Sequence, residues 1–460
     1  MIQRRDEWTD PAPKRQTRRR RRSLCRNICV AIASASALVG AVSAIALRKQ
    51  ASDNVMMAED TSEQSWIGKR LEEIPSLAGQ LDGSTLSYIG TMLEYDLMVA
   101  DPSYANNASY MYNLITMEND CKWEYLQRYD YERCDYGANF AADNGMGFRF
   151  HALVYPEGGD PTFLTRMYDA GNLTNIERKR FLSTHIKETV SRYRGTATAF
   201  DVVNEAVCDF GYFCYPGNNC TEYLTETVTD AGVWQYDLTD CVYSDLYGTY
   251  VKSSLWYNGG GPGSQSGMET FVDESFIMAH KESSESLLCY NDYKHESMYG
   301  FSQNKSDAVY NMIVGMLDRG VPVNCVGFQT HIDISYVNKT RYVEGYRDNM
   351  QRYADLNLTV MITEFDAKCT DEHSDLPCSS WDGDQEAEQA ELYGNIIQLC
   401  IEQPACNAFE SWGYTDADSF ADSDDEYGSR HPFPFDSFYR AKPAFGAMYR
   451  ALVPLSSSSS

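Results

Sequence analysis

An apolar run at residues 197–204 leads directly into Glu205, in the order Asp201-Val202-Val203-Asn204-Glu205. Two later apolar runs end the same way, as Gly327-Phe328-Gln329-Thr330-His331 and as Val360-Met361-Ile362-Thr363-Glu364-Phe365-Asp366. Buried parallel strands have short apolar sequences of this kind, and their carboxyl ends open onto the loops that carry functional groups. These three stretches are therefore predicted to be parallel strands whose ends share one functional edge.

Five further short runs, rich in β-branched or aromatic residues, alternate with longer amphipathic segments along the chain. The eight predicted strands cover residues 86–90, 113–116, 147–155, 197–204, 286–291, 323–330, 358–363 and 407–412. Between them, residues 175–194 and 307–319 repeat apolar side chains at helical spacing, which predicts helices. Strands that alternate with helices indicate an α/β protein with a parallel sheet, and eight such units predict a (β/α)8 TIM barrel.

The predicted barrel covers residues 85–454, more than the roughly 250 residues that a closed barrel needs. Most of the excess falls at residues 206–263, after the fourth strand, where Gly, Tyr, Asp and four Cys gather without a helical period. We interpret this segment as a disulfide-rich insertion. A polar stalk is predicted at residues 48–84, and a disordered serine tail at residues 455–460.

The first 50 residues combine a basic segment with an apolar one. Five consecutive arginines at residues 18–22 precede an uncharged stretch at residues 28–47, which is long enough to span a bilayer. The positive-inside rule places residues 1–27 in the cytoplasm and everything after the stretch outside or in a lumen. We therefore expect a transmembrane signal anchor and a single-pass type II membrane protein. Small residues at 35–37 and 44–46 leave a cleavable signal peptide, followed by secretion, as the alternative.

Charge is distributed unevenly over the chain. Its net charge is −27, although residues 1–50 hold 12 of the 39 basic side chains and three acidic ones. The remainder is strongly acidic, and such a surface repels nucleic acid and anionic lipid headgroups. A nucleic-acid partner is therefore not expected, whereas a neutral or cationic partner suits this surface.

Cysteine usage agrees with export from the cytosol. Twelve of the 14 cysteines follow residue 50, an even number that allows six disulfides. Several lie close together in the sequence, namely Cys369 with Cys378, Cys400 with Cys406, and the group Cys208, Cys214, Cys220 and Cys241. Glycosylation sequons also follow the predicted anchor, so we expect a glycoprotein modified at some of Asn107, Asn172, Asn219, Asn304, Asn338 and Asn357.

Two glutamates follow predicted strand ends, Glu205 after the fourth strand and Glu364 after the seventh. Because the carboxyl ends of all barrel strands open onto one mouth, both side chains are expected there. Hydrolysis of a glycosidic bond requires such a pair, since one carboxyl protonates the leaving oxygen while the other attacks the anomeric carbon or activates water. No cofactor is expected for this chemistry, and neither the cysteine spacings nor the acidic residues 416–426 match a zinc or calcium site.

From about residue 88 to residue 452 the sequence resembles glycoside hydrolase family 10, the β-1,4-xylanase family. Seven blocks carry the resemblance and follow one another in the family's order: MENDCKW at 117–123, RFHALVY at 149–155, FDVVNE at 200–205, NDY at 291–293, GFQTH at 327–331, ITEFD at 362–366 and SWGYTD at 411–416. The resemblance implies a TIM barrel and a retaining endo-1,4-β-xylanase, with the polysaccharide xylan as its substrate and no cofactor.

Carried over position by position, the resemblance also implies a role for each matching residue. Glu205 is then the general acid/base and Glu364 the nucleophile, with their carboxyls about 5 to 5.5 Å apart. His331 orients Glu364, and Asn204 hydrogen-bonds the 2-hydroxyl of the sugar beside the scissile bond. The remaining matches contact the sugar or line the cleft, namely Glu118, Asn119, Lys122, His151, Gln329 and Trp412.

Several positions depart from the family's usual pattern. Tyr155 and Pro156 stand where Trp and His are common, Phe200 replaces a frequent Trp, Cys121 a frequent Met, and Phe420 a second Trp. Both predicted catalytic glutamates are present, so these departures bear on substrate preference and turnover more than on reaction type. Two alternatives stay open: a retaining glycosidase for another β-linked glycan or a small β-xyloside, and a membrane-anchored protein that binds glycans with little or no turnover.

Overall fold

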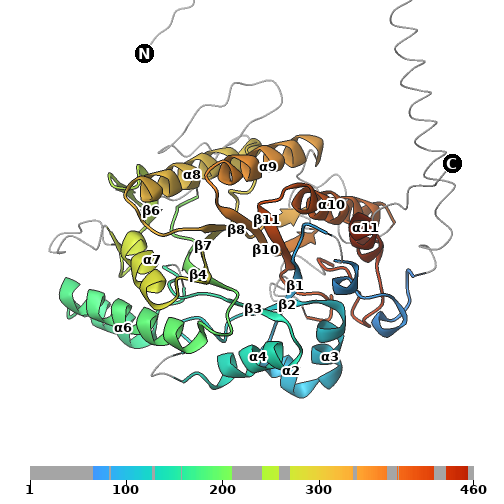
Figure 1. Cartoon of the computed structure of the whole chain (residues 1–460), viewed down its shortest axis with the longest axis horizontal. Coiled ribbons are helices and arrows are strands. Elements are labelled where there is room, and N and C mark those ends of the chain that lie inside the picture. The colour runs from blue at the N-terminus through green and yellow to red at the C-terminus, as the bar shows by residue number, and fades with distance from the viewer. Residues whose placement is uncertain are drawn as a thin grey trace, which may run out of the picture. The chain divides into compact units, whose positions relative to one another are not determined.

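Eight short parallel strands close into a barrel in the computed structural model of the chain (Figure 1). They are β1 (Tyr88–Leu93), β2 (Leu114–Met117), β3 (Gly147–Phe150), β4 (Ala199–Asn204), β7 (Leu287–Asp292), β8 (Cys325–Phe328), β10 (Thr359–Lys368) and β11 (Cys406–Ser411). The pairing of β11 with both β10 and β1 closes the ring. Almost all residues of these strands are buried, as expected for a sheet covered on both faces. The predicted TIM barrel is confirmed.

The structure describes residues 66–81, 84–126, 130–156, 158–209, 241–257, 270–334, 339–369, 381, 383–418 and 431–453. The predicted cytoplasmic tail, the membrane segment at residues 28–47 and the serine tail lie outside these ranges, as does most of the predicted stalk. In the part that is described, no helix has the length and apolar character needed to cross a bilayer. The anchor therefore stays a prediction.

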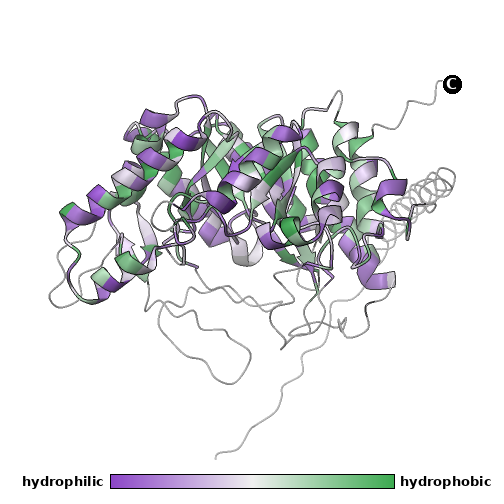
Figure 2. Cartoon of the chain, turned by 90° about the horizontal axis from the view of Figure 1, so that it is seen from below, coloured by the Kyte–Doolittle hydropathy of each residue, from purple (hydrophilic) through white to green (hydrophobic). Residues whose placement is uncertain are grey.

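Helices surround the barrel (Figure 1). They are α2 (Tyr95–Ala100), α3 (Pro102–Met111), α4 (Glu132–Asp143), α5 (Thr162–Asp169), α6 (Asn175–Tyr193), α7 (Phe271–Glu282), α8 (Gln303–Asp318), α9 (Lys339–Ala354), α10 (Gly383–Glu402) and α11 (Pro443–Leu452). Short 3₁₀ turns add η1 (Leu71–Glu73), η2 (Ala78–Gln80) and η5 (Gly300–Ser302). Hydrophilic and hydrophobic residues alternate along the helices, while the strands are mostly hydrophobic (Figure 2). The apolar helix faces thus cover the outside of the barrel.

Helix α6 shows how local signals in the sequence set an element. Thr174 and Glu177 form a capping box, in which each side chain accepts a hydrogen bond from the backbone N–H of the other. Ile186 and Val190 lie one turn apart and are fully buried, so one face of the helix packs against the core. The helix predicted at residues 175–194 is confirmed.

All eight predicted strands are present, although their ends differ from the prediction. The third strand was predicted at residues 147–155, but β3 ends at Phe150. Val154 then makes a single parallel bridge to Val203 of β4, so the chain stays beside the barrel without a continuous ladder. The helix predicted at residues 307–319 is confirmed as α8, which begins earlier, at Gln303, and ends at Asp318.

The described part of the predicted insertion contains a β-hairpin. Its strands, β5 (Cys241–Ser244) and β6 (Thr249–Lys252), pair in the antiparallel direction. A disulfide joins Cys208 to Cys241, and Val207 makes an antiparallel bridge to Val251 of β6. The hairpin is therefore tied directly to the segment of chain that follows Glu205.

Further disulfides support the prediction of an exported, disulfide-bonded domain. They join Cys121 to Cys134, Cys289 to Cys325, and Cys400 to Cys406. Cys400 and Cys406 are thus one group of cysteines close in sequence whose members bond to each other, which the sequence left open. Cys369 is also disulfide-bonded, whereas Cys214, Cys220 and Cys378 lie outside the described residues.

Candidate active site

Glu205 directly follows the last residue of β4 and lies at the carboxyl-terminal mouth of the barrel. Its φ of +52° falls in the left-handed region, and its N–H donates to the carbonyl oxygen of Asn291 at 2.9 Å. Its Oε1 accepts from the side-chain amides of Asn204 at 3.0 Å and Gln329 at 2.8 Å. Its Oε2 accepts from the hydroxyl of Tyr155 at 3.0 Å. Three donors from three parts of the barrel therefore hold the carboxyl in place.

The pKa of the Glu205 carboxyl is raised above its ordinary value. Burial is the largest cause, because it removes water from the charged form. The ammonium group of Lys252, with Nζ 3.7 Å from Oε2, opposes this effect, while the carboxylates of Asp292 and Glu364 add to it. A carboxyl that keeps its proton to higher pH is suited to act as a general acid.

Glu364 lies within β10 and is 4% exposed. Burial alone would raise its pKa, but its hydrogen bond from His331 and its interactions with His151 and Arg149 lower the pKa to about 2. Asn291 donates a further hydrogen bond from Nδ2 to Oε1 at 2.7 Å. This carboxylate stays ionised at neutral pH, as a nucleophile must.

Two asparagines connect the two glutamates. Asn291 donates from Nδ2 both to Oε1 of Glu364 and to Oδ1 of Asn204, the second bond at 2.9 Å. Asn204 in turn donates to Glu205, as described above. Gln329 also donates from Nε2 to both Asn204 and Glu205, with Oδ1 of Asn204 at 3.3 Å. The two carboxyls thus belong to one hydrogen-bonded cluster, as the strand-end pattern predicts.

His331 begins β9 (His331–Asp333), a short strand that pairs with the far end of β10. Its Nδ1 hydrogen-bonds the carboxylate of Asp366, and its Nε2 lies 3.4 Å from Oε2 of Glu364. Burial would lower the pKa of His331, but the two carboxylates raise it to about 9. Since both ring nitrogens face carboxylates, the imidazole is held as a cation and keeps Glu364 ionised.

A buried ionic network lies beside Glu364. His151 donates from Nδ1 to Oδ2 of Asp201 at 2.8 Å, and the same nitrogen is 3.8 Å from Oε1 of Glu364. Arg149 is fully buried, forms an ion pair with Asp201, and donates from Nε to Glu410 at 2.7 Å. Because removing one member would leave buried charges unpaired, this network holds the base of the site in one arrangement.

Glu118, Asn119 and Lys122, which are predicted to contact the sugar, follow the end of β2 at the same mouth of the barrel. Lys122 donates from Nζ to Oδ1 of Asn119 at 2.8 Å. Burial lowers the pKa of Lys122, while the charges of Glu364, Glu118 and Glu205 raise it, so its ammonium group lies within electrostatic reach of all three. Burial also raises the pKa of Glu118 to about 7. Such polar groups can bind the hydroxyls of a sugar.

Trp412 follows β11 and completes the cluster. Its ring lies edge-on to the ring of His151, with the centroids 5.3 Å apart, and the guanidinium of Arg149 is 5.9 Å from its centroid. An indole face suits the apolar face of a pyranose ring. Through these contacts Trp412 joins the buried network beside Glu364. Lys122 approaches Glu205 by way of Tyr155, whose ring centroid lies 5.6 Å from its Nζ and whose hydroxyl donates to Glu205.

Several residues of this cluster had no predicted role, among them Arg149, Asp201, Asn291 and Lys252. The first three are charged or amide side chains within strands that are otherwise apolar, and that pattern was available in the sequence. Lys252 lies in the insertion, where no pattern in the sequence points to the site. Its place is visible from the tertiary structure alone.

The departures from the family pattern have different structural consequences. Tyr155 is part of the site, since its hydroxyl donates to Glu205. Cys121 forms a disulfide, and Phe200 is fully buried in the strand that precedes the site. Phe420 lies outside the described residues. Tyr155 is thus the departure that bears most directly on the chemistry.

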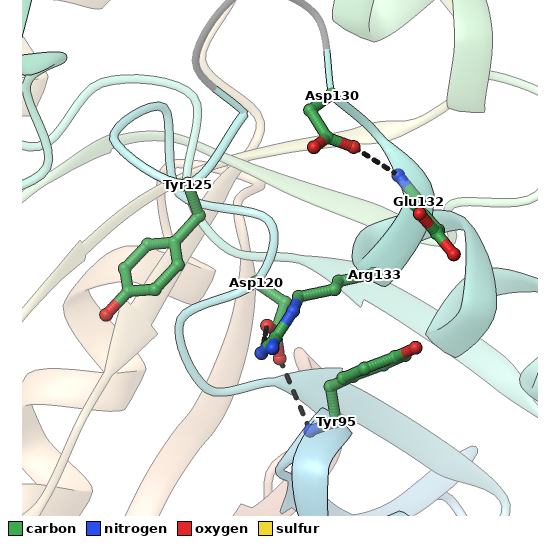
Figure 3. Close-up of a pocket in the computed structure, with 6 residues that line it drawn as sticks. All are labelled: Tyr95, Asp120, Tyr125, Asp130, Glu132 and Arg133. Atoms are coloured by element: carbon green, nitrogen blue, oxygen red, sulfur yellow. Dashed lines mark hydrogen bonds and ion pairs between the residues drawn. The ribbon is translucent and has the colours of Figure 1, made fainter. Parts of the chain in front are cut away.

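A separate pocket of about 390 Å³ lies beside the start of α4 (Figure 3). It is lined by Tyr95, Asp120, Tyr125, Asp130, Glu132 and Arg133. Within it, Asp120 accepts from the backbone N–H of Tyr95 at 3.3 Å and lies 3.4 Å from Arg133. None of the predicted site residues lines this pocket. No three His, Cys, Asp or Glu side chains of the described ranges are arranged to hold a metal ion.

A TIM barrel with two glutamates at its mouth, one with a raised and one with a lowered pKa, has the architecture of a glycoside hydrolase. The family model described as Glycosyl hydrolase family 10 matches residues 76–451. The chain belongs to this family. The resemblance found in the sequence is thereby confirmed.

Relatives with this fold cover most of the chain. Endo-1,4-beta-xylanase B of Thermotoga neapolitana is 30% identical over 350 residues, which are 75% of this chain and 82% of the relative. The crystal structure of native xylanase 10B from Thermotoga maritima has a TM-score of 0.64 at 28% identity, and covers 82% of this chain and 98% of its own. Xylanase 10B from Thermotoga petrophila, in complex with xylobiose, has a TM-score of 0.63 at 28% identity, with 82% and 97% covered.

Proposed function

We propose that the protein is a retaining endo-1,4-β-xylanase that hydrolyses internal β-1,4 bonds of xylan by double displacement. The observation that carries the proposal is the contrast between the two glutamates at the barrel mouth. The pKa of Glu364 is lowered to about 2, whereas burial raises that of Glu205. One carboxyl is therefore ionised and the other inclined to hold a proton, which is the pairing that a retaining glycosidase needs.

In the first step, a carboxylate oxygen of Glu364 attacks the anomeric carbon of the bound sugar. The bond from that carbon to the glycosidic oxygen breaks, and Glu205 gives its proton to the departing oxygen. Asn291 and His331 hold the attacking carboxylate, with Asn291 Nδ2 at 2.7 Å and His331 Nε2 at 3.4 Å from its oxygens. The product of this step is a glycosyl ester of Glu364.

In the second step, water replaces the sugar on Glu364. Esterification removes the negative charge of Glu364, which is one of the causes that raise the pKa of Glu205. Glu205 then accepts a proton from the attacking water, the ester bond breaks, and Glu364 returns as a carboxylate. The two displacements together retain the configuration at the anomeric carbon.

The relatives support xylan as the substrate of this protein. The Thermotoga neapolitana relative is an endo-1,4-β-xylanase, and the Thermotoga petrophila relative binds xylobiose. The strongly acidic exported part of this chain suits an uncharged polysaccharide. Glu118, Asn119 and Lys122 supply polar contacts, and Trp412 supplies an aromatic face for the sugar ring.

The test uses the exported part of the chain, wild type beside Glu364→Gln, incubated with xylan, cellulose and aryl β-xylosides. New reducing ends are measured, together with the lengths of the products. We expect xylan to yield short oligosaccharides with the wild type and none with Glu364→Gln. The variant Glu285→Gln removes the charge of an exposed glutamate and serves as the control with unchanged activity.

Each other outcome has a defined meaning. Cleavage of cellulose or of aryl xylosides in preference to xylan would replace the proposed substrate and keep the reaction. Binding of xylan by folded protein with no hydrolysis of any of these substrates would overturn the enzyme and favour a glycan-binding protein. Equal activity of wild type and Glu364→Gln would remove Glu364 from the mechanism.

The proposal includes a location on the outer or lumenal side of a membrane. The basic residues 1–27 and the apolar residues 28–47 support a type II signal anchor, and the disulfides support export. Expression of the full chain in a eukaryotic cell, followed by carbonate extraction, is the test. Retention of the intact chain in the membrane pellet is expected, whereas a shortened chain in the medium would favour cleavage and secretion. A mobility shift on deglycosylation of the product would test the predicted sequons.

A further inference from the structure

The hairpin of β5 and β6 is built onto the chain that leaves the acid/base. The N–H of Lys252 donates to the carbonyl of Ala206 at 2.9 Å, and the N–H of Cys208 donates to the carbonyl of Tyr250 at 3.1 Å. The Cys208–Cys241 disulfide ties the other strand of the hairpin to the same segment. These backbone hydrogen bonds therefore fix the backbone of Lys252 opposite Ala206, the residue that follows Glu205.

The side chain of Lys252 points toward the catalytic carboxyl. Its Nζ lies 3.7 Å from Oε2 of Glu205, and the side chain is 11% exposed. Nζ also donates to the hydroxyl of Tyr293 at 3.4 Å and lies 5.0 Å from the centroid of that ring. Tyr293 follows β7, so the ammonium group is held between two strand ends of the barrel. A cation so shielded from water acts more strongly on its partner than an exposed one.

Two neighbouring lysines contact the same tyrosine ring and have different partners. Lys305 pairs with Asp292 and with Asp209, each at 2.8 Å. Lys294 pairs with Asp209 at 3.0 Å and lies 5.4 Å from the Tyr293 centroid. In the described part of the chain, the lysine that forms an ion pair with Glu205 is Lys252. Lys294 therefore serves as a control, because it carries the same charge beside the same ring but pairs with Asp209, although its side chain is 42% exposed.

We propose that the hairpin of β5 and β6 is part of the active site, and that Lys252 is a positioning residue which holds the Glu205 carboxyl and sets the pH range of its acid function. The inference rests on the proposed function in one respect, the assignment of Glu205 as the general acid. It gives a role to the insertion after the fourth strand.

The direction of the effect follows from the charges that face Glu205. These groups are the hydroxyl of Tyr155, the carboxylates of Asp292 and Glu364, and the ammonium groups of Lys252 and Lys122. Burial raises the pKa of Glu205 and Lys252 lowers it. Because the first step needs protonated Glu205, kcat/KM falls as the pH rises through this pKa. Removing the ammonium group should therefore extend activity to higher pH.

The experiment compares pH profiles of kcat/KM on xylan for the wild type, Lys252→Met, Lys252→Gln, Lys252→Arg and Lys294→Met. We expect the alkaline limb to move up by roughly one pH unit in both neutral Lys252 variants. Lys252→Arg keeps the charge and should keep the wild-type limb, as should Lys294→Met. A parallel NMR titration of ¹³C-labelled glutamate in the folded proteins follows the ionisation of Glu205 without any need for turnover.

The outcomes separate this inference from the proposed function. An unmoved alkaline limb in folded Lys252→Met, or an equal move in Lys294→Met, would overturn the role of Lys252 while leaving the xylanase intact. A wild type that cleaves no glycan would overturn the proposed function, and the NMR titration would then decide on Lys252 alone. If neither neutral variant folds, Lys252 is a structural residue and the inference is wrong.

Discussion

Glu205 and Glu364 are the same residue type, and their neighbours make them chemically different. Both carboxyls are buried, which by itself raises a carboxyl pKa. The histidine cation of His331 reverses this effect at Glu364, whereas the donors around Glu205 leave its pKa raised. The reaction proposed for the site depends on this difference.

A first prediction concerns the proton that Glu205 supplies. Glu205→Ala should lower kcat on xylan by about 10² to 10⁴, because the sugar leaving group needs a general acid. In an aryl β-xyloside with a strongly acidic phenol, the phenolate departs without needing a proton. The rate of the first step should therefore be nearly unaffected for this substrate. Stopped-flow release of the phenol is expected to show a burst followed by a slow phase, since the second step has lost its base.

Azide provides a control for the same variant. A small anion can enter the space of the lost carboxylate and attack the glycosyl ester without a base, so azide should accelerate the slow phase of Glu205→Ala. The expected product is the β-glycosyl azide, identified by NMR. An α-azide, or acceleration of the wild type to the same degree, would contradict the assignment of Glu205.

A second prediction concerns pH at the acid side. Glu364 attacks as a carboxylate, so activity is lost as the pH falls through its pKa, which is about 2 in the wild type. His331→Asn removes the cation that lowers this pKa. The acid limb of the kcat/KM profile should therefore move to higher pH by roughly one to two units. The pH–rate profile measures it, and an acid limb that stays at the wild-type position would contradict the role of His331.

At the scale of elements, the length of β10 places the histidine beside the nucleophile. Among the eight barrel strands, β10 runs for ten residues, and its far end continues past the barrel to pair with β9. The register sets Asp366 opposite His331, two residues after Glu364. Side chains two apart on a strand share a face, so Glu364 and Asp366 both reach the same imidazole.

A third prediction compares two disulfides. Cys289 and Cys325 join neighbouring strands β7 and β8 across 36 residues, whereas Cys400 and Cys406 are six apart. If a disulfide acts mainly on the entropy of the unfolded chain, replacing the first pair by Ala should lower the free energy of unfolding by about 4 kcal/mol and the second by about 2 kcal/mol. Equilibrium urea unfolding measures both, and equal losses would contradict the entropic account.

At the scale of the whole molecule, one arginine joins strands from opposite parts of the barrel. Arg149 comes from β3 and pairs with Asp201 of β4 and Glu410 of β11. It also donates to the carbonyl of Thr363 in β10 at 2.9 Å. These strands are far apart in the sequence, so the network forms when the barrel closes. It supports the floor of the site from the barrel interior.

A fourth prediction tests this network. Arg149→Met should lower the free energy of unfolding by about 3 to 5 kcal/mol, because it leaves two buried carboxyls without their cation. Arg70 forms an exposed ion pair with Glu72, and Arg70→Met should cost less than about 1 kcal/mol. Equilibrium denaturation of both variants gives the comparison. A loss for Arg149→Met no larger than for Arg70→Met would show that the network carries little of the stability.

Much of the architecture follows from the sequence by itself. Apolar runs of strand length, helical periods such as that of α6, and polar residues at strand ends predicted the barrel, its eight strands and the two glutamates. These features are local, because the burial of each strand and helix face constrains residues that are neighbours along the chain. The carboxyl end of β3 escaped prediction, since its ladder stops at Phe150, where the chain turns into the site.

The tertiary structure alone decided which distant groups meet. Arg149 contacts Glu410 across 261 positions of sequence, and Lys252 reaches Glu205 by way of a hairpin in the insertion. No local pattern encodes such contacts, because they depend on how the barrel closes and on where a disulfide holds a loop. The ionisation of the glutamates is decided there too, since burial and distant charges set each pKa. The strand-end pattern thus identifies the two glutamates and their place at the mouth, whereas the closed barrel sets how they ionise.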